Sequence, residues 1–186
     1  MSSLSHIEQE EYKDIEALES LEDLEELKEF FIDFNAEKIS KIASKVDALS
    51  EEGEVLQRLL GVEDETMHIY YECARELLDQ KKKEEAANAF LFLTMLNPYV
   101  YDFWMGLGIA EQLREEHEHA LKAFSMASLI NLDHPAPHFF AANSYIALGK
   151  KEEAKDALKL TIEGSKKEKD FQVYYKQAKI MERSLI

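Results

Sequence analysis

Apolar residues recur at intervals of three and four along most of the chain, which is the spacing of one face of an α-helix. Six glycines and three prolines interrupt the pattern, too few for the tight turns of a β-sandwich, a β-barrel or a doubly wound sheet. The chain is therefore predicted to be all-α. The breaks between apolar stripes predict paired helices at 67–79 with 83–97, 101–113 with 117–130, and 135–147 with 151–163.

The three pairs repeat with a period of 34 residues. A large residue in each first helix recurs as Tyr70, Trp104 and His138. A small residue follows four positions later, as Ala74, Gly108 and Ala142. Small residues at this position let two helices pack closely, and this period is typical of the tetratricopeptide repeat. We therefore predict three tandem tetratricopeptide helix pairs that form a right-handed solenoid with a concave inner surface.

A further apolar stripe follows the third pair and has Asp170 as a candidate N-cap. Because the end of a stacked array needs a cover, we interpret this stripe as a C-terminal capping helix. The expected organisation is an acidic N-terminal segment, N-terminal helices, three repeats and the capping helix. Their ranges are 1–34, 35–66, 67–168 (67–100, 101–134 and 135–168) and 169–186.

Most of the charge lies in the N-terminal third. The formal net charge of the chain is −16, and residues 1–66 hold 20 acidic and 6 basic side chains. The negative net charge argues against a nucleic acid or an anionic membrane as partner, because both require a basic surface. We expect the segment 1–34 to be partly disordered or helical only when bound. Within 35–66, four apolar residues form one helical stripe: Ile39, Ile42, Val46 and Leu49.

The compartment is predicted from the absence of export and membrane signals. The first residues contain neither the basic region nor the apolar region of a secretory signal. The longest apolar run, 86–96, is too short to span a bilayer. The single cysteine, Cys73, has no partner for an internal disulfide, which fits a reducing compartment. We expect a soluble cytoplasmic protein without membrane insertion.

Residues that could carry chemistry are present but do not form a recognisable set. His117 and His119 are two positions apart and so face different sides of a helix. His134 and His138 straddle a predicted helix start, and no further ligand completes a tetrahedral metal site. No phosphate-binding loop or nucleophile motif is present. We therefore expect a protein that is not an enzyme and that binds no metal or cofactor.

A second face of each first helix, at offsets of four and seven residues, is predicted to line the concave surface. Six of its nine residues are apolar or aromatic on a face expected to see solvent, which is typical of a peptide-binding groove. The alternative is that these side chains are buried against neighbouring helices. The nine residues are Tyr71, Arg75, Leu78, Met105, Ile109, Gln112, Phe139, Asn143 and Ile146.

At the stretch Phe103–Gly108, at Gln112, and at Pro135–Ala142 ahead of Gly149, the chain resembles the class II chaperones of bacterial type III secretion. The resemblance covers about residues 55–165. It implies a cytoplasmic chaperone that binds an extended segment of hydrophobic translocator proteins in the groove and keeps them soluble for export. It also implies a homodimer in the unbound state, formed through the helices before the repeats. The candidate dimerisation residues are then Ile39, Ile42, Val46 and Leu49.

Three features depart from the family pattern, one of which is an acidic N-terminal region longer than is common in the family. Arg75 stands where the family usually has an apolar groove residue, and Lys81–Lys83 replace the glycine and aromatic of the first turn. The alternative function is a general tetratricopeptide adaptor or scaffold for another peptide partner. An adaptor that grips a terminal carboxylate lines its groove with Lys, Arg and Asn, and here Arg75 and Asn143 qualify.

Overall fold

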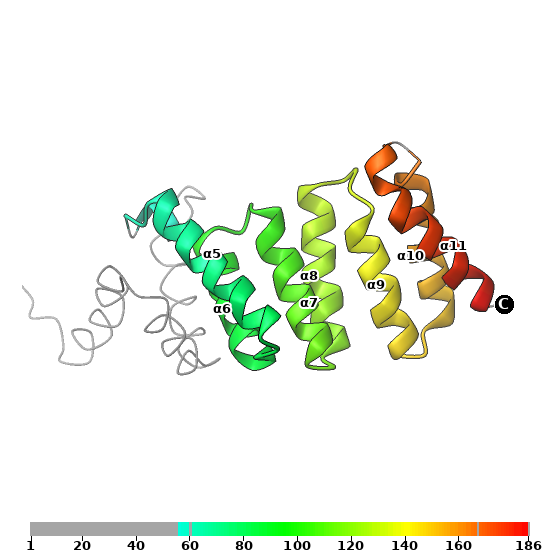
Figure 1. The fold of residues 1–186 in the computed structure, drawn as a ribbon, viewed down its shortest axis with the longest axis horizontal. Helices are drawn as coiled ribbons and strands as arrows, with labels where there is room; N and C mark the ends of the chain where they lie inside the picture. The colour runs from blue at the N-terminus through cyan, green and yellow to red at the C-terminus, as the bar shows by residue number, and fades with distance from the viewer. Residues whose placement is uncertain (1–55, 60, 167, 186) are drawn as a thin grey trace, which may run out of the picture.

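The computed structural model describes residues 56–59, 61–166 and 168–185 (Figure 1). A short helix α4 (Leu56–Leu59) precedes the array, and the expectations for residues 1–55 lie outside the described residues. The helices that follow are α5 (Asp64–Asp79), α6 (Lys83–Leu96), α7 (Tyr101–Leu113), α8 (His117–Ile130), α9 (Ala136–Ala147), α10 (Lys151–Gly164) and, after a 3-10 turn η2 (Lys169–Phe171), α11 (Gln172–Ser184). The predicted all-α fold is confirmed.

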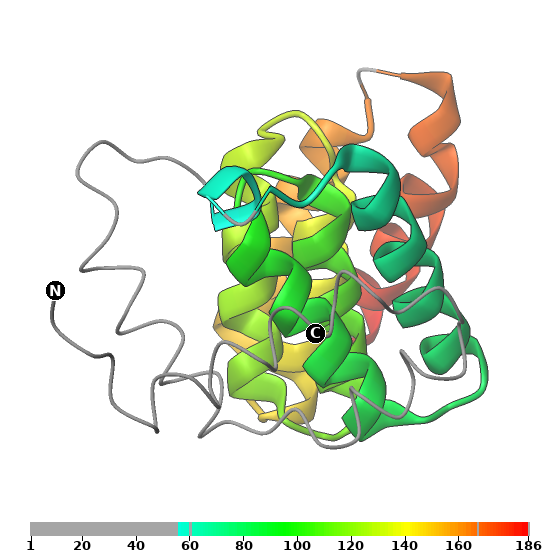
Figure 2. The same ribbon diagram turned by 90° about the vertical axis from the view of Figure 1, so that its left-hand side faces the viewer.

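The helices stack in chain order along the long axis of the array, from α5 at one end to α11 at the other (Figure 1). Each helix packs against the next, and the first helices of successive pairs also touch, α5 with α7, α7 with α9 and α9 with α11. Viewed along the array, α5 and α11 lie on the same side (Figure 2). The first helices therefore form one layer and the second helices α6, α8 and α10 the other.

Close helix packing depends on two glycines of α7. A Cβ atom at Gly106 would overlap the Phe90 ring of α6, and one at Gly108 would overlap the Phe124 ring of α8. Both rings are about 1% exposed and so have no room to move. The two glycines thus let α7 approach both of its neighbours, and at Gly108 this explains why the period of 34 places a small residue.

The turns inside the three pairs repeat the same backbone geometry. Lys81, Glu115 and Gly149 lie 34 residues apart, and all have positive φ, at 60°, 66° and 71°. In each turn, the next residue donates its N–H to a carbonyl five residues back, as in a Schellman cap. These bonds join Lys82 to Leu77, Glu116 to Glu111 and Lys150 to Tyr145, at 3.0, 2.9 and 2.9 Å. The left-handed turn is therefore built at Lys81 and Glu115 without a glycine.

Helix α11 covers the end of the array. Its buried Ala178 and its Tyr174, Tyr175 and Met181 side chains pack on an apolar cluster of α9 and α10. The sequence suggested Asp170 as the N-cap of α11, and this prediction is wrong. The chain enters α11 through the 3-10 turn, so Phe171 is the residue before the helix. Among the described residues, no helix is long and apolar enough to cross a membrane.

Candidate peptide-binding groove

The nine predicted groove residues lie on the layer of first helices, three each on α5, α7 and α9. Arg75 and Ile146 are exposed, and Ile146 is 37% accessible. Five further side chains are half-buried: Tyr71, Leu78, Ile109, Gln112 and Asn143. The structure therefore brings the nine residues to one layer, with different degrees of access. Their assignment to a peptide site stays a prediction.

Two of the nine are buried, and the expectation that this whole face sees solvent is wrong for them. Phe139 is 9% exposed because its ring packs against Phe140 and Tyr174, with centroids 5.7 and 5.6 Å apart. Met105 is 8% exposed and belongs to an apolar cluster with Phe124. At these positions the alternative of burial against neighbouring helices is the better description.

The α5 end of the groove face is built around Tyr71. Its ring lies against Phe90 and Phe103, with centroid distances of 6.2 and 5.7 Å. The guanidinium carbon of Arg75 lies 5.8 Å from the centre of the Tyr71 ring, and the same group forms a 3.2 Å ion pair with Glu72. Burial raises the pKa of Tyr71, with a smaller contribution from Asp102, so its hydroxyl stays neutral. Arg75 thus already has two partners on its own helix.

Gln112 connects two of the first helices. Its side-chain amide donates to the carbonyl of Phe140 at 2.8 Å and to Ser144 Oγ at 2.7 Å. These bonds fix α9 relative to α7, since both acceptors lie on α9. Besides its predicted role as a groove residue, Gln112 therefore has a structural role, because it links α7 to α9.

His134 lies in an aromatic cluster that no spacing in the sequence indicates. The Tyr101 hydroxyl and the N–H of Ala136 both lie within hydrogen-bond distance of His134 Nδ1, at 3.0 and 3.2 Å. The His134 ring also packs against Phe171 and Tyr174, at 4.7 and 6.1 Å between centroids. Burial lowers the pKa of His134, although Asp102 and Glu168 oppose the shift. The histidine thus joins α7, the start of α9 and α11 as a structural residue.

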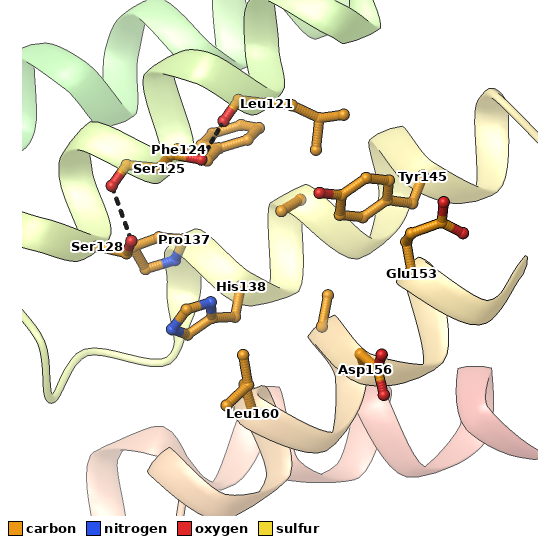
Figure 3. Close-up of a pocket in the computed structure, with 12 residues that line it drawn as sticks. Leu121, Phe124, Ser125, Ser128, Pro137, His138, Tyr145, Glu153, Asp156 and Leu160 are labelled. Atoms are coloured by element: carbon orange, nitrogen blue, oxygen red, sulfur yellow. Dashed lines mark hydrogen bonds between the residues drawn. The ribbon is translucent and has the colours of Figure 1, made fainter. Parts of the chain in front are cut away.

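A pocket of about 300 Å³ opens on the opposite side, between α8, α9 and α10. His138 and Tyr145 lie beside it, with Glu153, Asp156 and Leu160 across from them (Figure 3). The pocket lies where two residues of the third helix pair are smaller than their equivalents one period of 34 residues earlier. His138 and Ala141 stand where the larger Trp104 and Leu107 stand in the preceding pair. Sequence reasoning missed this pocket, although the same comparison of residue sizes could have indicated it.

Metal-ligating side chains do not cluster in residues 56–59, 61–166 and 168–185. In these ranges no three His, Cys, Asp or Glu side chains lie together as a metal site would require. Cys73 is fully buried, and so is not available as a nucleophile at the surface. Within the part of the chain that the structure describes, the nine-residue face and the pocket are the features that suggest binding.

Comparison with known proteins identifies relatives of the chain, although no protein-family model matches it. The chain is 28% identical over 122 residues to the chaperone protein SicA of Salmonella dublin, covering 66% of this chain and 73% of SicA. The translocator chaperone SycD of Yersinia enterocolitica has the same fold, with a TM-score of 0.67 and 23% identity over 72% of this chain and 99% of SycD.

SycD has also been crystallised with a peptide of the translocator YopD, at a TM-score of 0.64 and 23% identity over 67% of this chain and 95% of that one. It is also known as an alternative dimer, at a TM-score of 0.64 and 22% identity over 67% of this chain and 94% of that one. The sequence relatives are chaperones, and the structures share their stacked helix pairs. The chain is therefore similar in sequence to a type III secretion chaperone and shares the fold of the translocator chaperone SycD.

Proposed function

We propose that the chain is a chaperone that binds an extended segment of a hydrophobic translocator protein along the layer of first helices. The observation that carries this proposal is the row of partly accessible side chains at matching positions of α5, α7 and α9. Leu78, Ile109 and Ile146 would supply apolar contacts, and the buried Met105 and Phe139 would form the floor beneath them. The relatives support the same reading, since SycD binds a peptide of YopD.

The mechanism follows from burial of apolar surface. A translocator segment that lays its apolar side chains on this layer removes them from water and from contact with other unfolded chains. The chaperone then needs no chemical step, so we propose that it acts by binding and not as an enzyme. We also propose a cytoplasmic location, because a partner must be held before its export.

The unbound protein is proposed to be a homodimer. The supporting observations are the alternative dimer of SycD and the apolar stripe of Ile39, Ile42, Val46 and Leu49. These four residues lie outside the described residues, so the stripe rests on the sequence pattern alone.

The adaptor alternative has weaker support. A groove that grips a terminal carboxylate needs cations free to donate hydrogen bonds. Arg75 is the cation among the nine residues, and it is occupied by Glu72 and the Tyr71 ring. An apolar, internal segment of a partner therefore fits this layer better than a carboxylate terminus.

A pair of matched variants tests the proposed site. Ile146→Glu places a charge on the groove face, and Leu160→Glu places the same charge beside the pocket on the opposite side. Both side chains are accessible, at 37% and 49%, so both variants should keep their fold. Binding of a hydrophobic secreted protein from the same genome, measured in a co-expression pull-down and by titration, should weaken at least about tenfold for Ile146→Glu alone.

The control decides between the two surfaces. Unchanged melting temperatures for both variants ensure that lost binding reports on the site and not on unfolding. Loss of binding by Leu160→Glu with retention by Ile146→Glu would assign the partner to the pocket between α8, α9 and α10. That outcome would overturn the groove.

A further inference from the structure

Helix α11 occupies the position of a further first helix in the array. Residues that pack toward the preceding pair recur at the period of 34: Gly106, Phe140 and Tyr174, and Ala110, Ser144 and Ala178. The same step carries the groove positions Phe139, Asn143 and Ile146 to Val173, Gln177 and Ile180. The layer of first helices therefore continues onto α11, on the side where α5 and α11 both lie (Figure 2).

The face of α11 that continues the groove layer carries a stripe in which cationic and aliphatic residues alternate. Val173 and Ile180 are 60% and 67% exposed, which is high for apolar side chains of this size. The α11 stripe consists of Lys169 of η2 and of Val173, Lys176, Ile180 and Arg183 of α11, at spacings of four and three residues. Within the described ranges none of its three cations forms an ion pair, whereas the neighbouring Lys179 pairs with Glu182 at 2.9 Å. The stripe thus offers unpaired positive charge beside exposed apolar surface.

The segment 1–34 of this chain has the complementary pattern. It holds twelve acidic and two basic residues. Between its carboxylates, apolar residues recur every three positions, as Ile15, Leu18, Leu21, Leu24 and Leu27. Helix α5, at the opposite end of the array, is itself acidic, with five acidic residues and one arginine. An acidic segment is therefore repelled by α5 itself and attracted to the cations of the α11 stripe.

The connecting chain is long enough for the segment to reach α11 within one molecule. Residues 35–55 span about 32 Å even as a continuous helix, at about 1.5 Å per residue, and up to about 70 Å when extended. Three steps between neighbouring first helices, at about 8–10 Å each, separate α5 from α11. A tethered segment also acts at an effective concentration in the millimolar range, which favours the same chain over a second copy.

We infer that residues 1–34 dock on the α11 stripe of their own chain, carboxylates against the three cations and aliphatic side chains against Val173 and Ile180. The docked segment covers the α11 end of the groove layer and neutralises part of the charge of the segment. This contact requires no secreted partner, so it stands or falls independently of the proposed function.

Zero-length carbodiimide cross-linking of the full chain, followed by mass spectrometry, tests this contact because the reagent joins only touching carboxylates and amines. Links from residues 1–34 should reach Lys169 and Lys176 about fivefold more often than Lys81–Lys83, a basic cluster of similar size at the α5 end. In a mixture of isotope-labelled and unlabelled protein, the links should join segments of the same chain. High salt should reduce them, since it screens exposed charges.

A paired substitution separates the apolar contact from general attraction. Val173→Asn with Ile180→Asn keeps both reactive lysines and the charge of the stripe, and should lower their cross-linking about fivefold. The matched control, Leu129→Asn with Leu132→Asn, replaces residues that are 67% and 77% exposed elsewhere and should leave the links unchanged. Equal linking to Lys81–Lys83, links between different chains, or links that survive in the Val173/Ile180 variant would overturn the inference. Binding of the full chain to phosphatidylglycerol vesicles through the stripe would overturn it in favour of a membrane contact.

Discussion

Replacing Gly108 with leucine is expected to destabilise the protein by about 3 kcal/mol or more, because the new side chain has no space beside α8. Even a Cβ atom at this position overlaps the Phe124 ring, which is about 1% exposed. Overpacking of a rigid core contact costs about 1–3 kcal/mol and sometimes more. For a chain of this size, such a loss lowers the melting temperature by roughly 6–12 °C.

Alanine provides the sharper version of this experiment. Gly108→Ala should destabilise the protein although alanine favours a helix over glycine by about 1 kcal/mol. Gly164→Ala, at the end of α10, is the matched control, since its Cβ would lie 3.5 Å from Pro135 in ordinary contact. The control should be neutral or stabilising. Thermal melts in which both variants behave alike would show that the α7–α8 contact is not as close as described.

Phe139→Ala is expected to cost about 3 kcal/mol, the lower end of the range for a buried phenylalanine. The ring joins α9 to the capping helix through Tyr174, so its loss leaves a cavity and loosens α11. A chemical denaturation curve measures the loss directly. Val173→Ala, at an exposed position of α11, should change the stability by less than about 0.5 kcal/mol.

A double-mutant cycle with Tyr174→Ala gives the energy of the ring contact itself. The two substitutions should be non-additive by about 0.5–1.5 kcal/mol, which is typical of an aromatic pair. Wild-type stability in Phe139→Ala would instead mean that this ring faces the open groove, as the helix phase alone suggested.

The sequence predicted the helices well because their signals are local. The period of 34 places Gly108 and the left-handed turn at Gly149 by residue type, and the apolar spacing gives the helix bounds to within a few residues. The turn at Lys81 shows the limit of such signals. Lys81 has a positive φ like Gly149 but is not a glycine. The residue type therefore gives no sign of the left-handed turn, and only the period of 34 indicates it.

What the sequence could not give depends on contacts between distant helices. Helical phase identified the face that carries Met105 and Phe139, but their burial depends on side chains contributed by other helices, such as Tyr174 of α11. The cluster around His134 combines residues from three separate elements, and no spacing within one helix predicts it. Burial of a face is therefore known only once the neighbouring helices are placed.

The methionine methyl groups offer the most direct test of the groove. Met105 lies on the groove layer and Met126 on the second-helix layer, where it is 36% exposed. In methyl-labelled protein, titration with the N-terminal segment of a hydrophobic secreted protein from the same genome should shift the Met105 signal and leave that of Met126 unchanged. A shift of Met126 with Met105 unmoved would contradict binding along the first helices.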